Sequence, residues 1–179
     1  MTRTIFYTAT TLDGYLADER DRLDWLFEQE LETGGALDYD AFIAGVGAMA
    51  MGATTYEWVC NHLAATDGAW EYAVPCWVFT HRDLPAIADG ITFTQDPVAA
   101  VHHRMSQAAA GRNIWIVGGG DLACQFAQEG LLDELMLSIA PVTLGSGRPL
   151  FPRPFNLALV EHARNGAFLC ARYDVVSRR

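Results

Sequence analysis

Apolar runs and segments of helical period alternate along most of this chain. Runs of β-branched, aromatic and small apolar residues, such as 4–10 and 114–117, are typical of strands that are covered on both faces. Apolar residues that recur at helical spacing mark the segments between them, as in the stripe Val98, Val101, Met105 and Ala108. The predicted strands are 4–10, 46–51, 76–80, 91–94, 114–117, 135–140, 158–163 and 168–176. The predicted helices are 37–44, 56–63, one capped by Asp96-Pro97 and closed by Gly111, and one that starts after the glycines at 118–120 and stops at Gly130.

This order of elements predicts the fold class. Because strands alternate with helices, we expect a mainly parallel sheet with helices on both faces. The last two strands are joined by Asn165-Gly166, which is typical of a tight hairpin turn, so the sheet should end in an antiparallel pair. No repeat, low-complexity tract or change in composition divides residues 1–179, which we predict to form one α/β domain.

Composition and charge narrow the possible functions. The chain has 179 residues, 51% of them hydrophobic and 19% charged, which is typical of a globular domain with a sizeable core. We expect no membrane segment and no signal peptide, because neither pattern is present, and hence a cytoplasmic protein. A net charge of −10 argues against nucleic acid as a partner, although a nucleotide needs only local positive potential.

Cysteine and histidine positions indicate no metal site. The four cysteines form no C-x-x-C pair and lie in apolar surroundings, so we expect reduced core residues and no zinc. His102 and His103 are adjacent and therefore cannot form an i, i+4 ligand pair, and we expect both on the solvated surface. The cysteines are Cys60, Cys76, Cys124 and Cys170.

The chemistry of the chain centres on the glycines Gly118, Gly119 and Gly120. They follow a buried strand and precede a helix, so free N–H groups and the positive end of the helix dipole meet where the backbone can approach a ligand closely. This arrangement predicts a site for an anion such as a nucleotide phosphate. The alternative is a plain strand-to-helix turn, for which one or two glycines would be enough.

A second strand, glycine and helix follow the same plan. Gly52 ends the strand 46–51, and Thr54 and Thr55 lie in the first turn of the next helix. Their hydroxyls either donate to a phosphate or cap the helix, and the residues favour neither. The acidic loop 19–24 also follows a parallel strand, at the end of the sheet where α/β proteins bind ligands.

The glycines also match a dinucleotide fingerprint, but in the wrong context. Gly118-x-Gly120-x-x-Ala123 has the spacing of a Rossmann motif. It begins two thirds of the way along the chain, however, and the next strand ends at Ala140-Pro141 where an acid for the ribose is expected. A Rossmann dehydrogenase is therefore a weak alternative.

Two segments resemble the dihydrofolate reductase family. Residues 116–122, Ile-Val-Gly-Gly-Gly-Asp-Leu, are similar to the family's glycine turn at the cofactor diphosphate. Residues 50–56, Ala-Met-Gly-Ala-Thr-Thr-Tyr, resemble its M-G-R-x-T-[WY] segment. Further segments are similar to one branch, the C-terminal reductase domain of bifunctional riboflavin-biosynthesis enzymes and its stand-alone bacterial relatives. They are residues 11–17, 130–135, 141–145 and 150–151.

The resemblance implies a three-layer fold and an activity. The fold would have a mostly parallel central sheet with antiparallel C-terminal strands. The activity would be NADPH-dependent hydride transfer to a C=N or C=O group of a small pterin- or pyrimidine-like heterocycle. No zinc motif of the deaminase half is present, so a riboflavin role is doubtful. The implied cofactor contacts are Ala9, Leu16, Gly52, Ala53, Thr54, Thr55, Thr80, His81, Arg82, Val117, Gly118, Gly119, Gly120, Asp121 and Leu122.

The resemblance also implies substrate contacts, and the chain departs from the family in two ways. The loop after Asp13 would cover the nicotinamide, Trp25 would border the substrate, and Asp13 and Glu30 are the candidate catalytic carboxylates, with Asp13 also a candidate substrate contact. The first departure is at the acid, where Glu28, Asp38 and Asp40 compete with Glu30. In the second, Ala53 replaces the family's arginine, so Arg82, helped by His81 and with no acid beside it, would bind the 2′-phosphate of NADPH.

Two further expectations concern a homodimer and a non-catalytic alternative to the reductase. The last strands carry apolar residues on more than one face, so we expect a second subunit to cover them in a homodimer. A protein that kept the fold but lost the catalytic acid would bind NADPH as a sensor without turnover. The strand residues are Phe168, Leu169, Tyr173, Val175 and Val176.

Overall fold

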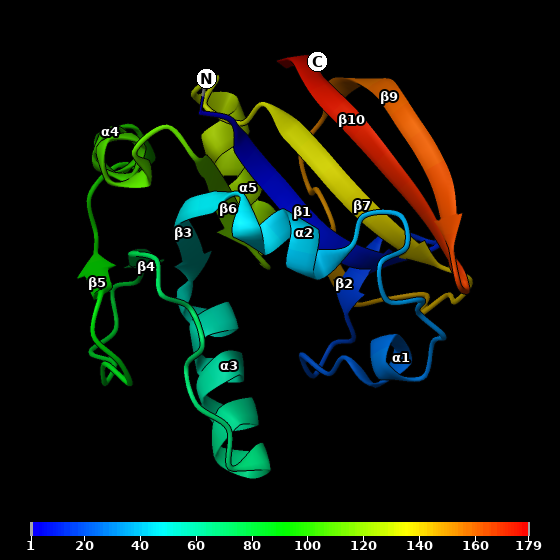
Figure 1. Ribbon diagram of the computed structural model, residues 1–179, viewed down its shortest axis with the longest axis horizontal. Coiled ribbons are helices and arrows are strands. Elements are labelled where there is room, and N and C mark those ends of the chain that lie inside the picture. The colour runs from blue at the N-terminus through cyan, green and yellow to red at the C-terminus, as the bar shows by residue number, and fades with distance from the viewer. Residues whose placement is uncertain (1, 179) are drawn as a thin grey trace.

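The computed structural model describes residues 2–178, which form one large sheet flanked by helices (Figure 1). The strands of the large sheet are β1 (Thr4–Thr11), β3 (Val46–Gly52), β4 (Cys76–Phe79), β5 (Ile91–Thr94), β6 (Asn113–Val117), β7 (Glu134–Ala140), β9 (Phe155–Asn165) and β10 (Phe168–Arg178). A small sheet contains β2 (Tyr15–Ala17) and β8 (Arg148–Pro149). The helices are α1 (Asp24–Phe27), α2 (Tyr39–Ala44), α3 (Ala53–Thr66), α4 (Val98–Ala109) and α5 (Gly120–Gln128).

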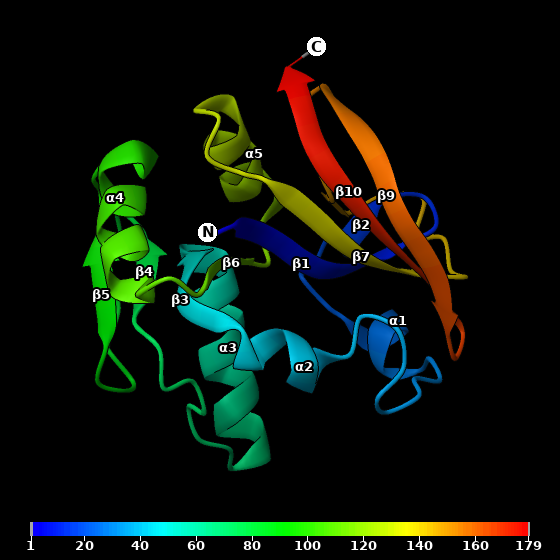
Figure 2. The ribbon, with the colours of Figure 1, turned by 45° about the horizontal axis from the view of Figure 1, so that its top comes forward.

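The large sheet is mostly parallel, as the sequence predicts. Its order is β5-β4-β3-β6-β1-β7-β10-β9, and every pair from β5 to β7 is parallel. β10 runs antiparallel to β7, and β9 runs antiparallel to β10 along the free edge of the sheet (Figure 2). The prediction of a parallel sheet with an antiparallel C-terminal pair is therefore confirmed.

The central strands are apolar throughout because both faces of the sheet are covered. On one face, Phe6 of β1 packs in a core with residues of α4 and α5. On the other face, Trp115 of β6 packs with Tyr56 of α3 and the partly buried Phe42 of α2. On β6, Ile114 and Ile116 pack in the first core and Trp115 packs in the second. A strand that is buried on both faces has no solvent-facing positions, so its sequence shows no alternating polar residues.

Three details of α4 differ from the sequence prediction. Ala109 rather than Ala108 completes the buried stripe, and Pro97 rather than Asp96 is the N-cap residue. The Asp96 carboxylate instead pairs with Arg104. His102 is also not on the solvated surface, because its ring lies 2.8 Å from Thr4 Oγ1, and burial lowers its pKa.

The hairpin of β9 and β10 turns one residue later than predicted and anchors a distant loop. Gly166 and Ala167 form its turn, while Asn165 is buried and pairs with Phe168. The Asn165 side chain accepts from Glu32 N at 2.9 Å and donates to the Ala36 carbonyl at 2.9 Å. Asn165, which the sequence indicates as a turn residue, is therefore a buried strand residue that anchors the loop 32–36 to the hairpin.

Candidate functional site

The three glycines make a tight turn between β6 and α5. Gly118 has φ +63° and Gly119 has φ +23°, in the region that favours glycine. A Cβ added to Gly118 would lie 2.5 Å from Thr55 Oγ1, so the turn touches the first residues of α3. A Cβ at Gly120 would lie 2.1 Å from the Leu150 carbonyl oxygen. At Gly119, by contrast, the nearest atoms beyond its chain neighbours would be Leu122 Cβ and Thr55 Oγ1, both at 3.9 Å, so a Cβ fits there at ordinary contact distance.

Helix α3 begins at Ala53, three residues earlier than predicted. Gly52 is its N-cap residue and provides no side-chain hydrogen bond, so neither Thr54 nor Thr55 caps the helix. The N-cap residue of α5 is Gly119, which also provides none. The N–H groups in the first turns of both helices therefore lack a side-chain partner at the cap and can interact with a ligand.

These two helix starts border an inner cavity of about 400 Å³. Eight of the 15 residues predicted to contact the dinucleotide line this cavity. They are Ala9, Leu16, Thr54, Thr55, Gly118, Gly119, Gly120 and Asp121. Its other lining residues are Thr8, Ala17, Asp21, Leu23, Leu26, Trp58, Arg148, Pro149 and Pro152. Four further predicted residues lie beside this lining set without belonging to it, namely Gly52, Ala53, Val117 and Leu122.

A small flap made by β2 and β8 contributes to the inner cavity. Tyr15 pairs with Pro149 and Ala17 pairs with Arg148, which brings segments more than 130 residues apart into one sheet. Gly147 allows this approach, because a Cβ there would lie 2.2 Å from the Ala17 carbonyl oxygen. Sequence reasoning missed β8, since two residues carry no periodic signal.

Asp13 organises the flap and does not line the inner cavity. Its carboxylate accepts from Thr11 Oγ1 at 2.6 Å, from Gly145 N at 2.7 Å and from Leu144 N at 3.0 Å. These hydrogen bonds, that of Thr11 first, lower the pKa of Asp13. Because its oxygens accept hydrogen bonds from the loop before β8, Asp13 is placed to hold the flap, and its catalytic and substrate-binding role stays a prediction.

Asp21 is the carboxylate that sequence reasoning missed. It has φ +59°, rare for a residue with a side chain, and it lines the inner cavity. Asp18 holds this turn by accepting from Arg20 N at 2.8 Å and from Arg22 N at 3.0 Å. Asp21 then forms two hydrogen bonds with Arg148, at 2.6 and 2.9 Å. The acidic loop 19–24 was the available signal, but it gave no reason to choose one acid.

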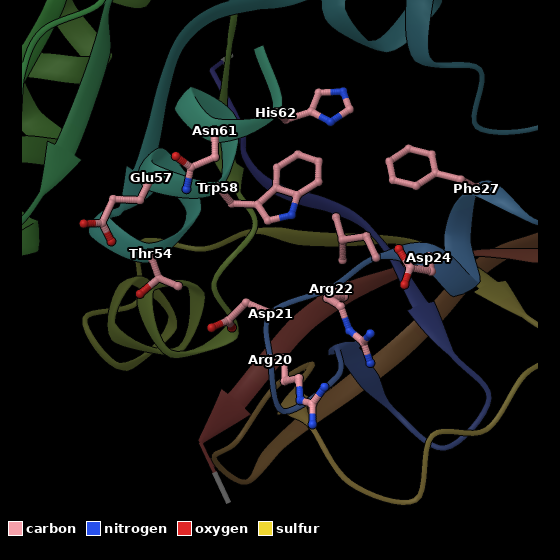
Figure 3. Close-up of a pocket in the computed structure, with 11 residues that line it drawn as sticks. Arg20, Asp21, Arg22, Asp24, Phe27, Thr54, Glu57, Trp58, Asn61 and His62 are labelled. Carbon is pink, nitrogen blue, oxygen red and sulfur yellow. The ribbon is translucent and has the colours of Figure 1, made fainter. Parts of the chain in front are cut away.

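An outer recess of about 550 Å³ adjoins the inner cavity. Asp21, Leu23, Thr54 and Trp58 line both, so the two form one continuous site. The remaining walls come from α1, the loop before it and the exposed side of α3 (Figure 3). They are Arg20, Arg22, Asp24, Phe27, Glu57, Asn61 and His62.

The predicted 2′-phosphate residues lie at the end of β4. Thr80 is buried, and its Oγ1 accepts from Arg82 N at 2.9 Å, while His81 and Arg82 are exposed. Arg82 Nη1 lies 2.6 Å from Glu57 Oε2, so the expectation that no acid lies beside Arg82 is wrong. Glu57 is 25 positions away in the sequence, which is why the pairing could not be predicted.

Trp25 and Glu30, the residues predicted to border the substrate and to act as an acid, line neither cavity. Trp25 is buried in a small core with Phe168 and Cys170, and neither cavity includes it. Glu30 is exposed, and its carbonyl oxygen accepts from Ala167 N at 2.9 Å. Leu23 and Leu26, on either side of Trp25, line the inner cavity in its place.

The described residues, 2–178, contain no group of three or more His, Cys, Asp or Glu side chains that could hold a metal ion. Within the same range, no helix is long and apolar enough to cross a membrane. The cysteines in this part of the chain are free, and three of the four are buried.

The chain is similar in sequence to a Bacillus subtilis protein and in fold to a Shewanella protein. It is 36% identical over 150 residues to YwjB of Bacillus subtilis (strain 168), a protein whose name states no activity, and the match covers 83% of this chain and 82% of YwjB. A solved protein of Shewanella sp. PV-4, described as a "Putative riboflavin biosynthesis protein", superposes with a TM-score of 0.82 at 23% identity, over 97% of this chain and 99% of that one.

A bifunctional enzyme has the same fold in part of its length. The diaminohydroxyphosphoribosylaminopyrimidine deaminase/5-amino-6-(5-phosphoribosylamino)uracil reductase of Thermotoga maritima superposes with a TM-score of 0.65 at 14% identity, over 98% of this chain and 57% of that one. A sequence model described as "RibD C-terminal domain" matches residues 3–169. With the eight-stranded sheet and its antiparallel end, these matches show that the chain belongs to the RibD C-terminal domain family and has its dihydrofolate reductase-like fold.

Proposed function

We propose that the protein is an NADPH-dependent reductase that transfers a hydride to a C=N or C=O group of a small pterin- or pyrimidine-like heterocycle. One observation carries the proposal: the glycine turn and the N-termini of α3 and α5 meet at one cavity, which opens into a second recess. Family membership supports it, because the Thermotoga maritima relative is named as a uracil-derivative reductase.

The inner cavity fits a dinucleotide diphosphate. Two helices, of 14 and nine residues, begin there without side-chain caps, so their N–H groups and dipoles favour an anion. At Gly119 no atom beyond its chain neighbours lies closer than 3.9 Å to the position of a Cβ, and we infer that phosphate oxygens fit against this part of the backbone. We assign the diphosphate to this turn.

The apolar part of the inner cavity suits the nicotinamide ring. Ala9, Leu16 and Leu23 line it, and the flap residues Arg148 and Pro149 lie on its border. When bound, NADPH supplies the hydride, and the protein has to hold two rings face to face and exclude water. Asp21 lies where the two cavities join, and we assign to its carboxylate the contact with the ring nitrogen or carbonyl oxygen that gains a proton from solvent.

The proposal is tested by measuring two quantities for the purified protein, NADPH binding and NADPH oxidation. We expect a micromolar dissociation constant, and oxidation with at least one member of a panel of pterins, deazaflavins and ribosylaminopyrimidines. Tight NADPH binding without turnover on the whole panel would instead favour the alternative, a sensor that binds NADPH. Failure to bind NADPH would exclude both.

Cofactor preference depends on the Arg82–Glu57 pair. We expect NADPH to bind more tightly than NADH, because Arg82 can bind the 2′-phosphate. Since Glu57 partly neutralises Arg82, Arg82→Ala should reduce the difference by only about 1 kcal/mol, the size expected for a half-exposed charged contact. Glu57→Gln should increase the preference about threefold, since Arg82 then has no competing anion. Calorimetric titration measures both, with Arg104→Ala on α4 as the control that removes a remote surface ion pair. Equal wild-type affinity for the two cofactors would contradict the assignment.

The exposed apolar residues of β9 and β10 support a homodimer. Leu159 and Val160 on the edge strand are 55% and 51% exposed, and Leu169 on β10 is 51% exposed. Phe168, one of the predicted interface residues, is instead buried in the core. We expect about twice the 19.7 kDa chain mass at micromolar concentration, and a monomer for Leu159→Glu. Light scattering measures the mass, and Leu12→Glu, at another exposed leucine, should stay dimeric. A monomeric wild type would contradict the expectation.

A further inference from the structure

The inner cavity has little positive charge to offer the diphosphate that we assign to it. Its charged lining residues are Asp21, Asp121 and Arg148. Arg148 is already paired, because its Nε and Nη2 lie 2.6 and 2.9 Å from the two carboxylate oxygens of Asp21. The backbone N–H groups of the glycine turn favour an anion, but the Asp121 carboxylate in the first turn of α5 repels one. A further cation near the turn would offset this repulsion.

Arg153 brings such a cation to the start of α5. Its Nη2 lies 3.0 Å from Asp121 Oδ1. Pro152, which precedes it, lines the inner cavity, and the Leu150 carbonyl lies against Gly120 in the glycine turn. The segment after β8 therefore crosses the start of α5 and places a guanidinium against the carboxylate beside the turn.

Asp121 has a second partner, so Arg153 can leave it at little cost. Gln125 Nε2, one turn along α5, donates to Asp121 Oδ2 at 2.8 Å. The Arg153 and Asp121 side chains are 38% and 63% exposed, and an exposed pair of this kind contributes little to stability. The other contact of the guanidinium is with the neutral amide oxygen of Gln128. A diphosphate carries more negative charge than one carboxylate and should therefore compete successfully for Arg153.

We propose that Arg153 is a further cofactor-binding residue, which exchanges Asp121 for a diphosphate oxygen when NADPH binds, and that Asp121 is an internal competitor that weakens cofactor binding. The inference rests on the proposed function and deepens it, because it names the pair that regulates cofactor affinity at the same site. The role differs from that of Arg82, since NADPH and NADH share the diphosphate and differ only in the 2′-phosphate. Arg153 should therefore contribute equally to the binding of both cofactors.

A double-mutant cycle measures the exchange. Calorimetry gives the dissociation constants of NADPH and NADH for the full-length protein and its variants. Asp121→Asn should strengthen binding of both cofactors about threefold, because it removes the competing charge. Arg153→Ala should weaken binding of both about 30-fold, because a contact is lost and Asp121 is left unneutralised. In the Asp121→Asn background, Arg153→Ala should still weaken both about tenfold, because the contact with the diphosphate is lost.

The cycle separates a ligand contact from simple neutralisation of Asp121. If Arg153 only neutralises Asp121, Arg153→Ala should change affinity by less than about twofold in the Asp121→Asn background, and that result overturns the contact. A loss confined to NADPH overturns it too, because Arg153 would then act at the 2′-phosphate. Unchanged or weaker binding by Asp121→Asn overturns the role of Asp121 as a competitor.

Controls come from an exposed pair of the same residue types. Arg104→Ala and Asp96→Asn break the ion pair beside α4 and should leave the affinity for both cofactors unchanged. Thermal melting checks that each variant is folded. If Arg153→Ala melts early, Arg153→Gln takes its place in the cycle, because glutamine can still donate to Gln128.

The binding measurements also separate this inference from the proposed reductase activity, because they need no turnover. If NADPH is oxidised with a substrate but Arg153→Ala has no effect in the Asp121→Asn background, the reductase proposal stands and the inference fails. If the cycle gives the expected losses and no substrate is reduced, the inference stands and the reductase proposal fails. Failure to bind either cofactor overturns both.

Discussion

Replacing Gly119 by alanine is expected to weaken NADPH binding about 100-fold while the protein stays folded. The new methyl group would meet no protein atom within 3.9 Å, so the packing is undisturbed. It would project into the space that we assign to phosphate oxygens, which would have to move away from the backbone N–H groups. A 100-fold loss is about 2.8 kcal/mol, in the range of one or two hydrogen bonds to a charged group.

Stability should fall only by the cost of the backbone conformation. Gly119 has φ +23°, where an alanine costs about 1–2 kcal/mol, so the melting temperature should drop by about 2–8 °C. Gly130→Ala is the matched control: it has φ +68°, open space around its Cβ and a position at the far end of α5. It should lose similar stability and bind NADPH normally. A Gly119→Ala variant that binds NADPH as tightly as Gly130→Ala would show that the turn does not hold the diphosphate.

The three glycines illustrate how far the sequence could identify the site. The run of glycines located the turn, and the preceding strand and following helix predicted its anion-binding character. The separate reasons for each glycine come from other segments: Gly118 lies against Thr55, and Gly120 lies against the Leu150 carbonyl. Those contacts depend on tertiary packing, so no local sequence pattern could show that Gly119 is the one glycine of the three with room for a Cβ.

The parallel sheet was predictable because burial on both faces leaves a local signal. Continuous apolar runs located β3, β4 and β6 to within one residue at either end. β7 starts one residue before its prediction, at Glu134, which looks polar and yet is 1% exposed. Its carboxylate lies 2.6 Å from Arg172 Nε on β10, a partner 38 residues away. A buried ion pair therefore extends a strand where the sequence indicates a loop.

The candidate catalytic carboxylate was harder to predict from the sequence than the candidate cofactor-binding turn. Backbone groups bind a diphosphate at a turn that the sequence marks with glycine, whereas an acid is chosen by where its loop folds. Asp13 and Glu30 are both near the predicted segments, but Asp13 binds the loop before β8 and Glu30 is exposed. Asp21 reaches the site because Asp18 holds its turn and Arg148 fixes its side chain.

Replacing Asp21 by asparagine is expected to lower the rate of NADPH oxidation about 100-fold and to leave NADPH affinity within about twofold. Asparagine tolerates the positive φ of this position and can still accept a hydrogen bond from Arg148, so the loop should keep its shape. What is lost is the negative charge beside the ring atom that gains a proton, a contribution of about 10²–10⁴ in enzymes that use such groups. Steady-state kinetics gives the rate, and calorimetry gives the affinity. Asp96→Asn, at a paired aspartate on the surface near α4, is the control and should change neither.

The arginine partner distinguishes a chemical role of Asp21 from a purely structural one. If the Asp21–Arg148 pair serves only to hold β8 against the loop 18–24, Arg148→Ala should reduce turnover as much as Asp21→Asn does. If the carboxylate acts on the substrate, Arg148→Ala should retain at least about a third of the wild-type rate, because it removes a competing cation and leaves the anion in place. An exposed ion pair of this kind contributes only about 0.2–1 kcal/mol to stability, so both variants should fold. Equal losses in the two variants would therefore assign Asp21 to the flap and leave the proton to a bound water.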